Sequence, residues 1–119
     1  SSLEAGVIVV DADLQVETWN RGAEELWGLR QEEVTGKHLL NLDIGLPVDE
    51  LRPALRRALT PRSAADDATQ SGGNREQIRV EAVNRRGRSV TLRVTCAPLA
   101  AADATVSGAI LAMEPIEAG

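Results

Sequence analysis

The alternation of apolar and polar residues predicts two strands at the start of the chain. Residues 6–10 form a β-branched run that is followed by an Asp-Ala-Asp segment, the pattern of a buried strand that ends in a turn. Residues 14–19 then alternate, with Val16 and Thr18 on one side and Trp19 on the other. We therefore expect a hairpin in which Trp19 points away from the face that Val16 occupies.

Helical signals follow the hairpin. Asn20 is a good N-cap because its side-chain oxygen can accept hydrogen bonds from the free amides of a first turn, and we expect that helix to run to about Trp27. Residues 31–34 predict one short helical turn. Residues 38–47 carry many apolar side chains without a clean period, so we expect this stretch to be irregular.

A second substantial helix is predicted for residues 48–59. Leu51 and Leu55 are four residues apart and lie on one face of such a helix. Pro53 complicates this helix because its ring removes an amide donor and crowds the preceding turn. Either the helix kinks at Pro53, or it begins near Arg52 with the proline in its first turn.

The second half of the chain changes to a period of two. Residues 60–76 are rich in small, polar, Gly and Pro residues and are expected to form a mobile surface loop. Residues 78–82 and 90–96 predict a long antiparallel hairpin around a turn at 84–88, and residues 106–113 predict a last strand. Five antiparallel strands with helices on one face give an α+β fold.

Length and charge narrow the classes of protein. With 119 residues, of which 43% are hydrophobic, we expect a single domain spanning residues 1–119. The net charge of -5 argues against a nucleic-acid or anionic membrane partner. No apolar run is long enough for a membrane span and the start does not resemble a signal peptide, so a cytoplasmic location is expected. The chain does not begin with Met, and we expect it to belong to a larger protein.

The residues offer little for catalysis. Cys96 is the only cysteine, so an internal disulfide and a structural zinc site are not expected, and its inward position on a strand is typical of a small buried hydrophobe. No nucleophile stands beside a base and no glycine-rich phosphate loop is present. We therefore expect no metal site and no enzyme activity.

The chain resembles the PAS domain family. The first half carries the resemblance in Gly-Val-Ile-Val-Val-Asp at 6–11, Val-Glu-Thr-Trp-Asn-Arg-Gly-Ala-Glu-Glu-Leu-Trp-Gly at 16–28 and Glu-Glu-Val-Thr-Gly-Lys at 32–37. The second half carries it in residues 84–88 and 106–111. Shorter segments are similar to PAS modules of bacterial sensor histidine kinases and of chemotaxis-type methylesterase/methyltransferase fusion proteins. The chain departs from the family in having Arg30 where Ser or Thr is usual, and in lacking Phe and Tyr.

The resemblance implies a five-stranded antiparallel sheet of order 2-1-5-4-3. Flavin-binding members need a reactive cysteine in a helical Asn-Cys-Arg-Phe type motif, which this chain lacks. Haem-binding members take an axial histidine from the long helix, whereas His38 precedes that helix. We therefore expect no cofactor. A cone-shaped nuclear-transport-factor-like fold is the structural alternative, although that fold normally begins with helices.

The resemblance implies a sensory and regulatory module in signal transduction, for example in a two-component or chemotaxis system. Two modes of action are open. In the first, the domain forms a homodimer and contacts neighbouring signalling domains through the outer face of the sheet, at Val7, Val9, Trp19 and Ile110. In the second, the space between sheet and helices binds a small apolar ligand. The residues that would line that pocket are Val16, Trp27, Leu51, Leu55, Val80, Leu92, Val94 and Cys96.

Overall fold

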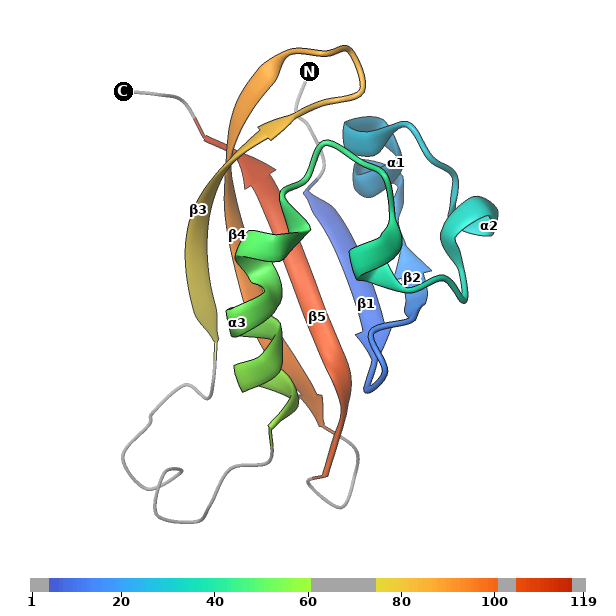
Figure 1. Ribbon diagram of the computed structural model, residues 1–119, viewed down its shortest axis with the longest axis vertical. Coiled ribbons are helices and arrows are strands. Elements are labelled where there is room, and N and C mark those ends of the chain that lie inside the picture. The colour runs from blue at the N-terminus through green and yellow to red at the C-terminus, as the bar shows by residue number, and fades with distance from the viewer. Residues whose placement is uncertain (1–4, 61–74, 101–104, 117–119) are drawn as a thin grey trace.

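The strands form one antiparallel sheet with the helices on one of its faces (Figure 1). The structure is a computed structural model that describes residues 5–60, 75–100 and 105–116. Its elements, in chain order, are β1 (Gly6–Asp11), β2 (Val16–Trp19), α1 (Arg21–Trp27), α2 (Gln31–Val34), the 3-10 turn η1 (Leu39–Asn41), α3 (Val48–Leu59), β3 (Glu76–Val83), β4 (Ser89–Ala100) and β5 (Val106–Pro115). The strand order is β2-β1-β5-β4-β3. The predicted α+β class and strand order are both confirmed.

The core lies between the sheet and the helices. On the inner face of the sheet, Ile8 pairs with Leu111 and Val10 pairs with Ala109 across β1 and β5, and all four side chains are fully buried. Helix α3 packs over β4 and β5 (Figure 1). The period-two pattern of the strands thus places one apolar row under the helices.

Trp19 does not lie where strict alternation places it. The pairing of β1 with β2 shifts between Val9 and Val10, so that Val9 faces Thr18 and Val10 faces Val16. Glu17 is the extra residue of this bulge, and a bulge reverses the alternation beyond it. Trp19 therefore shares the inner face with Val16 and is only 1% exposed. The interpretation that placed Trp19 on the outer face is wrong.

Helix α1 is fixed at both ends. The side-chain Oδ1 of Asn20 accepts hydrogen bonds from the amides of Ala23 at 2.9 Å and Val7 at 2.8 Å, and its Nδ2 donates to the carbonyl of Ala5 at 3.0 Å. Asn20 is thus both the N-cap of α1 and a bridge to β1. Gly28 ends the helix with φ of 79°, a left-handed conformation that favours glycine.

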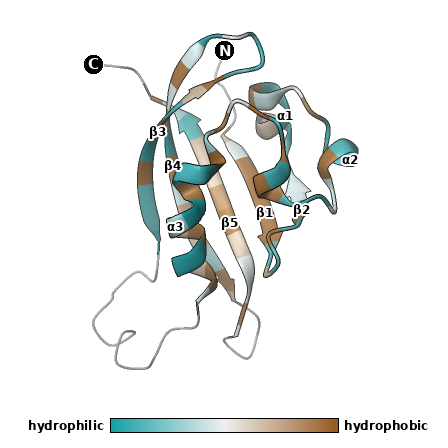
Figure 2. Cartoon of the chain, in the orientation of Figure 1, coloured by the Kyte–Doolittle hydropathy of each residue, from teal (hydrophilic) through white to brown (hydrophobic). Residues whose placement is uncertain are grey.

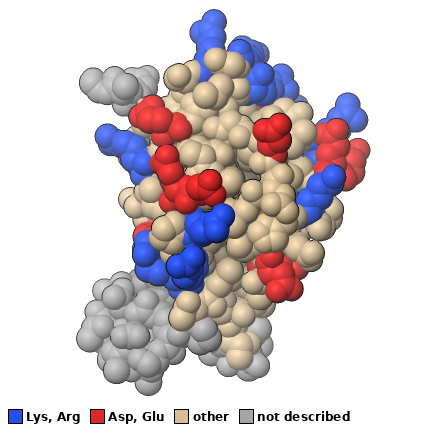
Figure 3. Space-filling view, viewed as in Figure 1, with Lys and Arg blue, Asp and Glu red and all other residues tan. Residues whose placement is uncertain are grey.

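Helix α3 begins earlier than Pro53 alone would suggest. It starts at Val48, after Pro47 as N-cap, so Pro53 lies inside the helix and not in its first turn. The proline is exposed, and it removes only the amide that would have bonded to the carbonyl of Asp49. Leu51 and Leu55 face the core, while the arginines of α3 are exposed. Figure 3 shows charged side chains scattered among uncharged ones on this side of the molecule.

The polar character of β3 distinguishes it from the other long strands. Figure 2 shows hydrophilic residues along much of β3, whereas β1 and β5 are mostly apolar. The predicted mobile loop at about 60–76 lies outside the described residues from 61 to 74, and Glu76 already belongs to β3. Strands β4 and β5 extend past their predicted ends, and the stretch predicted to be irregular contains η1.

The turn end of the β3–β4 hairpin is tied to the helical side of the molecule by two backbone hydrogen bonds. The amide of Val83 donates to the carbonyl of Gly45 at 3.0 Å, and the amide of Arg85 donates to the carbonyl of Leu26 at 2.9 Å. The backbones approach so closely that a Cβ atom on Gly45 would lie 1.7 Å from the carbonyl oxygen of Val83. Only glycine permits this approach.

Candidate functional site

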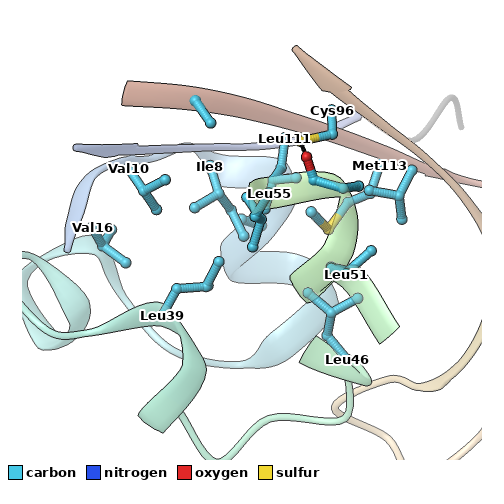
Figure 4. Packing of buried hydrophobic residues seen from close by; sticks show 14 of the residues in the cluster. Ile8, Val10, Val16, Leu39, Leu46, Leu51, Leu55, Cys96, Leu111 and Met113 are labelled. Carbon is cyan, nitrogen blue, oxygen red and sulfur yellow. Dashed lines mark hydrogen bonds between the residues drawn. The ribbon is translucent and has the colours of Figure 1, made fainter. Parts of the chain in front are cut away.

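The side chains predicted to line a ligand pocket lie together in the interior. They come from β2, α1, α3, β3 and β4, and none is more than 6% exposed. Figure 4 shows how Val16, Leu51, Leu55 and Cys96 converge between the sheet and the helices, together with Leu39. The packing makes this region a continuous hydrophobic core. Its chemistry suits apolar groups only, apart from one indole nitrogen.

That nitrogen belongs to Trp27. The side chain is 6% exposed, and its Nε1 is buried without a hydrogen-bond partner among the residues that the structure describes. The other indole is satisfied, because Nε1 of Trp19 donates to the carbonyl of Leu29 at 2.9 Å. A buried donor without an acceptor costs free energy. Among the predicted pocket residues, Trp27 is therefore the one that offers a ligand a free N–H donor.

Cys96 has the environment of an inert thiol. It is fully buried, and its Sγ lies 3.8 Å from the carbonyl oxygen of Ala54 (Figure 4). Burial raises the pKa of the thiol to about 11, and the negative charge of Glu76 adds to this rise. Since the thiolate is the nucleophile, Cys96 is not arranged to attack a substrate or to hold a metal near neutral pH.

His38 is occupied by a structural contact. Its Nδ1 accepts a hydrogen bond from the amide of Leu40 at 3.2 Å, which caps η1. It precedes α3 and is half-buried. Within residues 5–60, 75–100 and 105–116, no three His, Cys, Asp or Glu side chains lie together as a metal site would require.

The outer face of the sheet carries an apolar patch. Val9 pairs with Ile110, which pairs with Ala97, and Val7 pairs with Ala112, so these side chains form two adjacent rows. All five are half-buried. We call this set, Val7, Val9, Ala97, Ile110 and Ala112, the outer patch. It contains three of the four residues predicted for a dimer face, and only Trp19 is excluded, because it is buried.

The residues predicted for the dimer face did not include Ala97 or Ala112. The outward positions of β4 change from charged to apolar along the strand, from Arg93 to Ala97. This change in the sequence could have indicated that Ala97 belongs to the apolar patch. Much of the remaining outer face is polar, although Leu99 of β4 is half-buried and Val83 of β3 is 45% exposed. Arg93 forms an ion pair with Glu114 at 3.3 Å, and the hydroxyl of Thr91 donates to the carboxylate of Glu81 at 2.9 Å. The outer patch is therefore bounded by charged residues on one side.

An ion pair links the end of α3 to the start of β3. Arg57 donates two hydrogen bonds to the carboxylate of Glu76. One runs from Nε to Oε1 at 2.9 Å, and the other runs from Nη2 to Oε2. The hydrogen bond from Arg57 lowers the pKa of Glu76, and the same contact raises the pKa of Arg57. Since the Arg57 side chain is 62% exposed, solvent screens the interaction.

A groove opens at the end of the sheet, between α1 and the β3–β4 hairpin. Its volume is about 300 Å³. Leu26 of α1, Val90 of β4 and Pro115 at the end of β5 supply apolar contacts, while Arg85 and Arg86 stand on the hairpin side. The sequence reasoning did not find this groove, because its walls come from segments far apart in the chain.

Comparison with known proteins identifies the fold. A family model described as the PAS fold matches residues 1–118. Among curated protein sequences, none matches the chain. No helix within the described residues is long and apolar enough to cross a membrane.

Solved structures of low sequence identity share the architecture. A sensory box sensor histidine kinase from Vibrio cholerae has a TM-score of 0.70 at 17% identity, and the match covers 98% of this chain and 85% of that one. VqmA bound to DPO has a TM-score of 0.75 at 15% identity over 99% of this chain. The VqmA dimer of Vibrio cholerae has a TM-score of 0.68 at 14% identity over 98% of this chain.

The chain spans about half the length of the VqmA chains, with 55% and 48% of them covered. At these identities the likeness shows the fold alone. The family model, the strand order and the helices on one face agree with one another. The chain therefore belongs to the PAS family of sensory domains.

Proposed function

We propose that this domain is a regulatory module that acts through protein contact, with the outer patch as a homodimer surface. The outer patch carries the proposal: five apolar side chains are gathered on one face and remain half-buried rather than covered. A contiguous apolar patch with a polar border is typical of a protein interface. A second copy suits this patch because its own surface is equally apolar, and a two-fold contact needs self-complementary surfaces.

The structural neighbours support this mode of action. VqmA of Vibrio cholerae is described as a dimer, and a sensor histidine kinase shares the fold. A domain of this kind would relay a signal to neighbouring domains of a larger protein. The net charge of -5 favours a protein partner over nucleic acid.

A second candidate function is the binding of a small apolar ligand in the interior. Two observations favour it: the VqmA structure contains DPO, and Nε1 of Trp27 is a buried donor without an acceptor among the described residues. A ligand with a carbonyl group could accept from this nitrogen. The core would have to open to admit it, since the side chains around it are buried against one another.

Sedimentation equilibrium tests the homodimer. We expect the parent domain to dimerise, and a Val9→Glu/Ile110→Glu variant to be monomeric with an unchanged circular dichroism spectrum. The matched control is Arg79→Glu, because Arg79 is exposed on the polar part of the same face and the change adds negative charge without touching the outer patch. This control should remain dimeric.

A parent that stays monomeric at high concentration contradicts the dimer. So does a doubly substituted variant that remains dimeric. Trp19→Glu would not test the dimer, because Trp19 is buried and its replacement by a charge would unfold the domain. Native mass spectrometry of the freshly purified parent tests the second function at the same time, since it reports any bound ligand together with the oligomeric state.

A further inference from the structure

We propose that the groove between α1 and the β3–β4 hairpin binds a short amphipathic segment of a partner protein, with acidic residues beside aliphatic ones. This surface lies at the hairpin end of the sheet, on the side of the helices, and shares no residue with the outer patch. The proposal therefore goes beyond the homodimer and does not depend on it.

The walls of the groove are held in place by the fold. The amide of Arg85 donates to the carbonyl of Leu26 at 2.9 Å, which fixes the hairpin turn against the end of α1. The Cβ of Arg85 lies close to Gly28, where an added Cβ would be 3.1 Å away. The two walls thus keep their separation without a ligand, and a preformed groove lowers the entropy cost of binding.

The charge of the hairpin turn is opposite to that of the molecule. The turn carries arginines at 85, 86 and 88, all exposed, in a chain whose net charge is -5. Figure 3 shows a group of Lys and Arg side chains at the end of the molecule where this hairpin lies. In the described part of the chain, the guanidinium groups of Arg85 and Arg86 form no ion pair or hydrogen bond. They are available for a carboxylate.

The polar groups of the groove favour a peptide over a small molecule. Small-molecule sites use a few convergent polar groups inside an enclosed pocket. Here the side-chain oxygen of Asn84 already accepts from the amides of Arg86 at 2.9 Å and Arg88 at 3.1 Å, and the free polar groups are exposed arginines on the rim. An apolar floor with an arginine rim is the arrangement of protein interfaces.

Glu25 makes the groove directional. It lines the α1 side, opposite the arginines of the hairpin, so the two rims have opposite charge. An acidic residue of the bound segment would pair with Arg85 or Arg86, while a basic or neutral residue would face Glu25. This polarity would fix the orientation of the segment, because the reversed orientation places like charges together.

A display library of randomised peptides tests the composition of the segment. The library is selected on the immobilised parent domain, with the soluble Arg85→Glu/Arg86→Glu variant as competitor. We expect enrichment of sequences in which Asp or Glu stands next to Leu or Ile. Failure to enrich any sequence over the competitor, or enrichment of basic sequences, would overturn the proposal.

Fluorescence anisotropy of the best-enriched peptide, made synthetically with a dye, tests the charge pairing. The Arg85→Glu/Arg86→Glu variant should bind it at least about tenfold more weakly, and a peptide with Lys in place of its acidic residues should prefer the variant. The matched control is Arg52→Glu/Arg56→Glu on α3, which reverses two other exposed arginines and should bind as the parent does. An equal loss of affinity in the control variant would indicate non-specific electrostatic attraction and would contradict binding in the groove.

Amide chemical shifts place the binding site. The peptide should shift the amides around Leu26, Arg85 and Val90 and leave those of the outer patch unchanged. Shifts confined to the outer patch contradict the proposal, as do equal shifts at the groove caused by hexanoate alone, which would indicate a small carboxylate ligand. Shifts at the groove that grow with protein concentration in the absence of peptide would indicate a second copy and would also overturn it.

Discussion

The two faces of the sheet at β1 and β5 are similar in composition and different in environment. On the inner face, Ile8 and Leu111 pair across the strands and are fully buried. On the outer face, Val9 and Ile110 pair in the same way but remain half-buried. Because hydrophobic stabilisation follows the apolar area removed from water, the inner row stabilises the monomer more. The outer row keeps part of its exposure to solvent.

The largest expected effect in this comparison is on the reactivity of a thiol. Cys96 points inward, is fully buried and has a pKa raised to about 11. A thiol-specific reagent at about pH 8 should label it at least about a thousandfold more slowly in the native protein than in urea, since labelling requires opening of the core. Absorbance at the wavelength of the released dye measures both rates.

The next residue on the strand supplies the control. Ala97 belongs to the outer patch and is half-buried, so a Cys96→Ala/Ala97→Cys variant should label far faster than the parent. Equal labelling rates for the two native proteins would show that the inner face opens readily, and would contradict the proposed difference between the two faces. If the control is protected only at high protein concentration, the outer patch is covered by a second copy, as proposed.

Two alanine substitutions on β5 should show that a side chain on the inner face contributes more to the free energy of unfolding than its neighbour on the outer face. Leu111→Ala removes a fully buried side chain and should cost about 2–5 kcal/mol of unfolding free energy. Ile110→Ala should cost less than about 1 kcal/mol at low protein concentration, because its side chain keeps part of its exposure. Urea midpoints followed by tryptophan fluorescence measure the difference, and equal losses would show that both faces are packed.

The sequence predicted the order of the elements better than the direction of single side chains. Helix α1 and strand β1 were predicted to within one residue because the Asn20 cap, the Gly28 stop and the β-branched run are local signals. The outward direction of Trp19 was predicted wrongly, since a bulge at Glu17 depends on pairing with β1 and leaves no mark in the alternation itself.

The candidate sites were also predictable only where local sequence patterns define them. The interior set was predictable because period-two strands and a helix stripe each mark an inward face, and all eight predicted pocket residues are buried. The groove beside Arg85 was not, because Leu26, Val90 and Pro115 come together only through long-range pairing. Local patterns report the facing of residues in regular segments, whereas strand pairing decides it at the bulge beside Trp19. Tertiary structure alone decides which distant residues meet.

Asn20 joins the helical layer to the edge of the sheet, and its removal should have an intermediate effect. Asn20→Ala removes the acceptor for the amides of Val7 and Ala23 and should cost about 1–2 kcal/mol. Asn20→Asp keeps the acceptor and loses only the bond to the carbonyl of Ala5, so its loss should be smaller. Coincident urea midpoints for Asn20→Ala and the parent would contradict a capping role.

The smallest expected effect concerns the ion pair between Arg57 and Glu76. The hydrogen bond from Arg57 lowers the pKa of Glu76 below its ordinary value of 4.5, so the stabilisation is present above that value and is lost as the pH falls through the lowered pKa. The difference in urea midpoint between the parent and Glu76→Gln should be small near neutral pH and should shrink further as the pH falls below the ordinary pKa of Glu76. A difference that persists in acid would contradict this assignment.

The close approach of Gly45 to Val83 has a mechanical consequence. A hairpin joined to a sheet only by its own strands can swing as a free arm, but this one is fastened by the bonds from Val83 to Gly45 and from Arg85 to Leu26. Any side chain at position 45 would push the hairpin away, since its Cβ would overlap the carbonyl of Val83. The hairpin turn is therefore held by backbone hydrogen bonds against the end of α1 and against the loop that precedes α3.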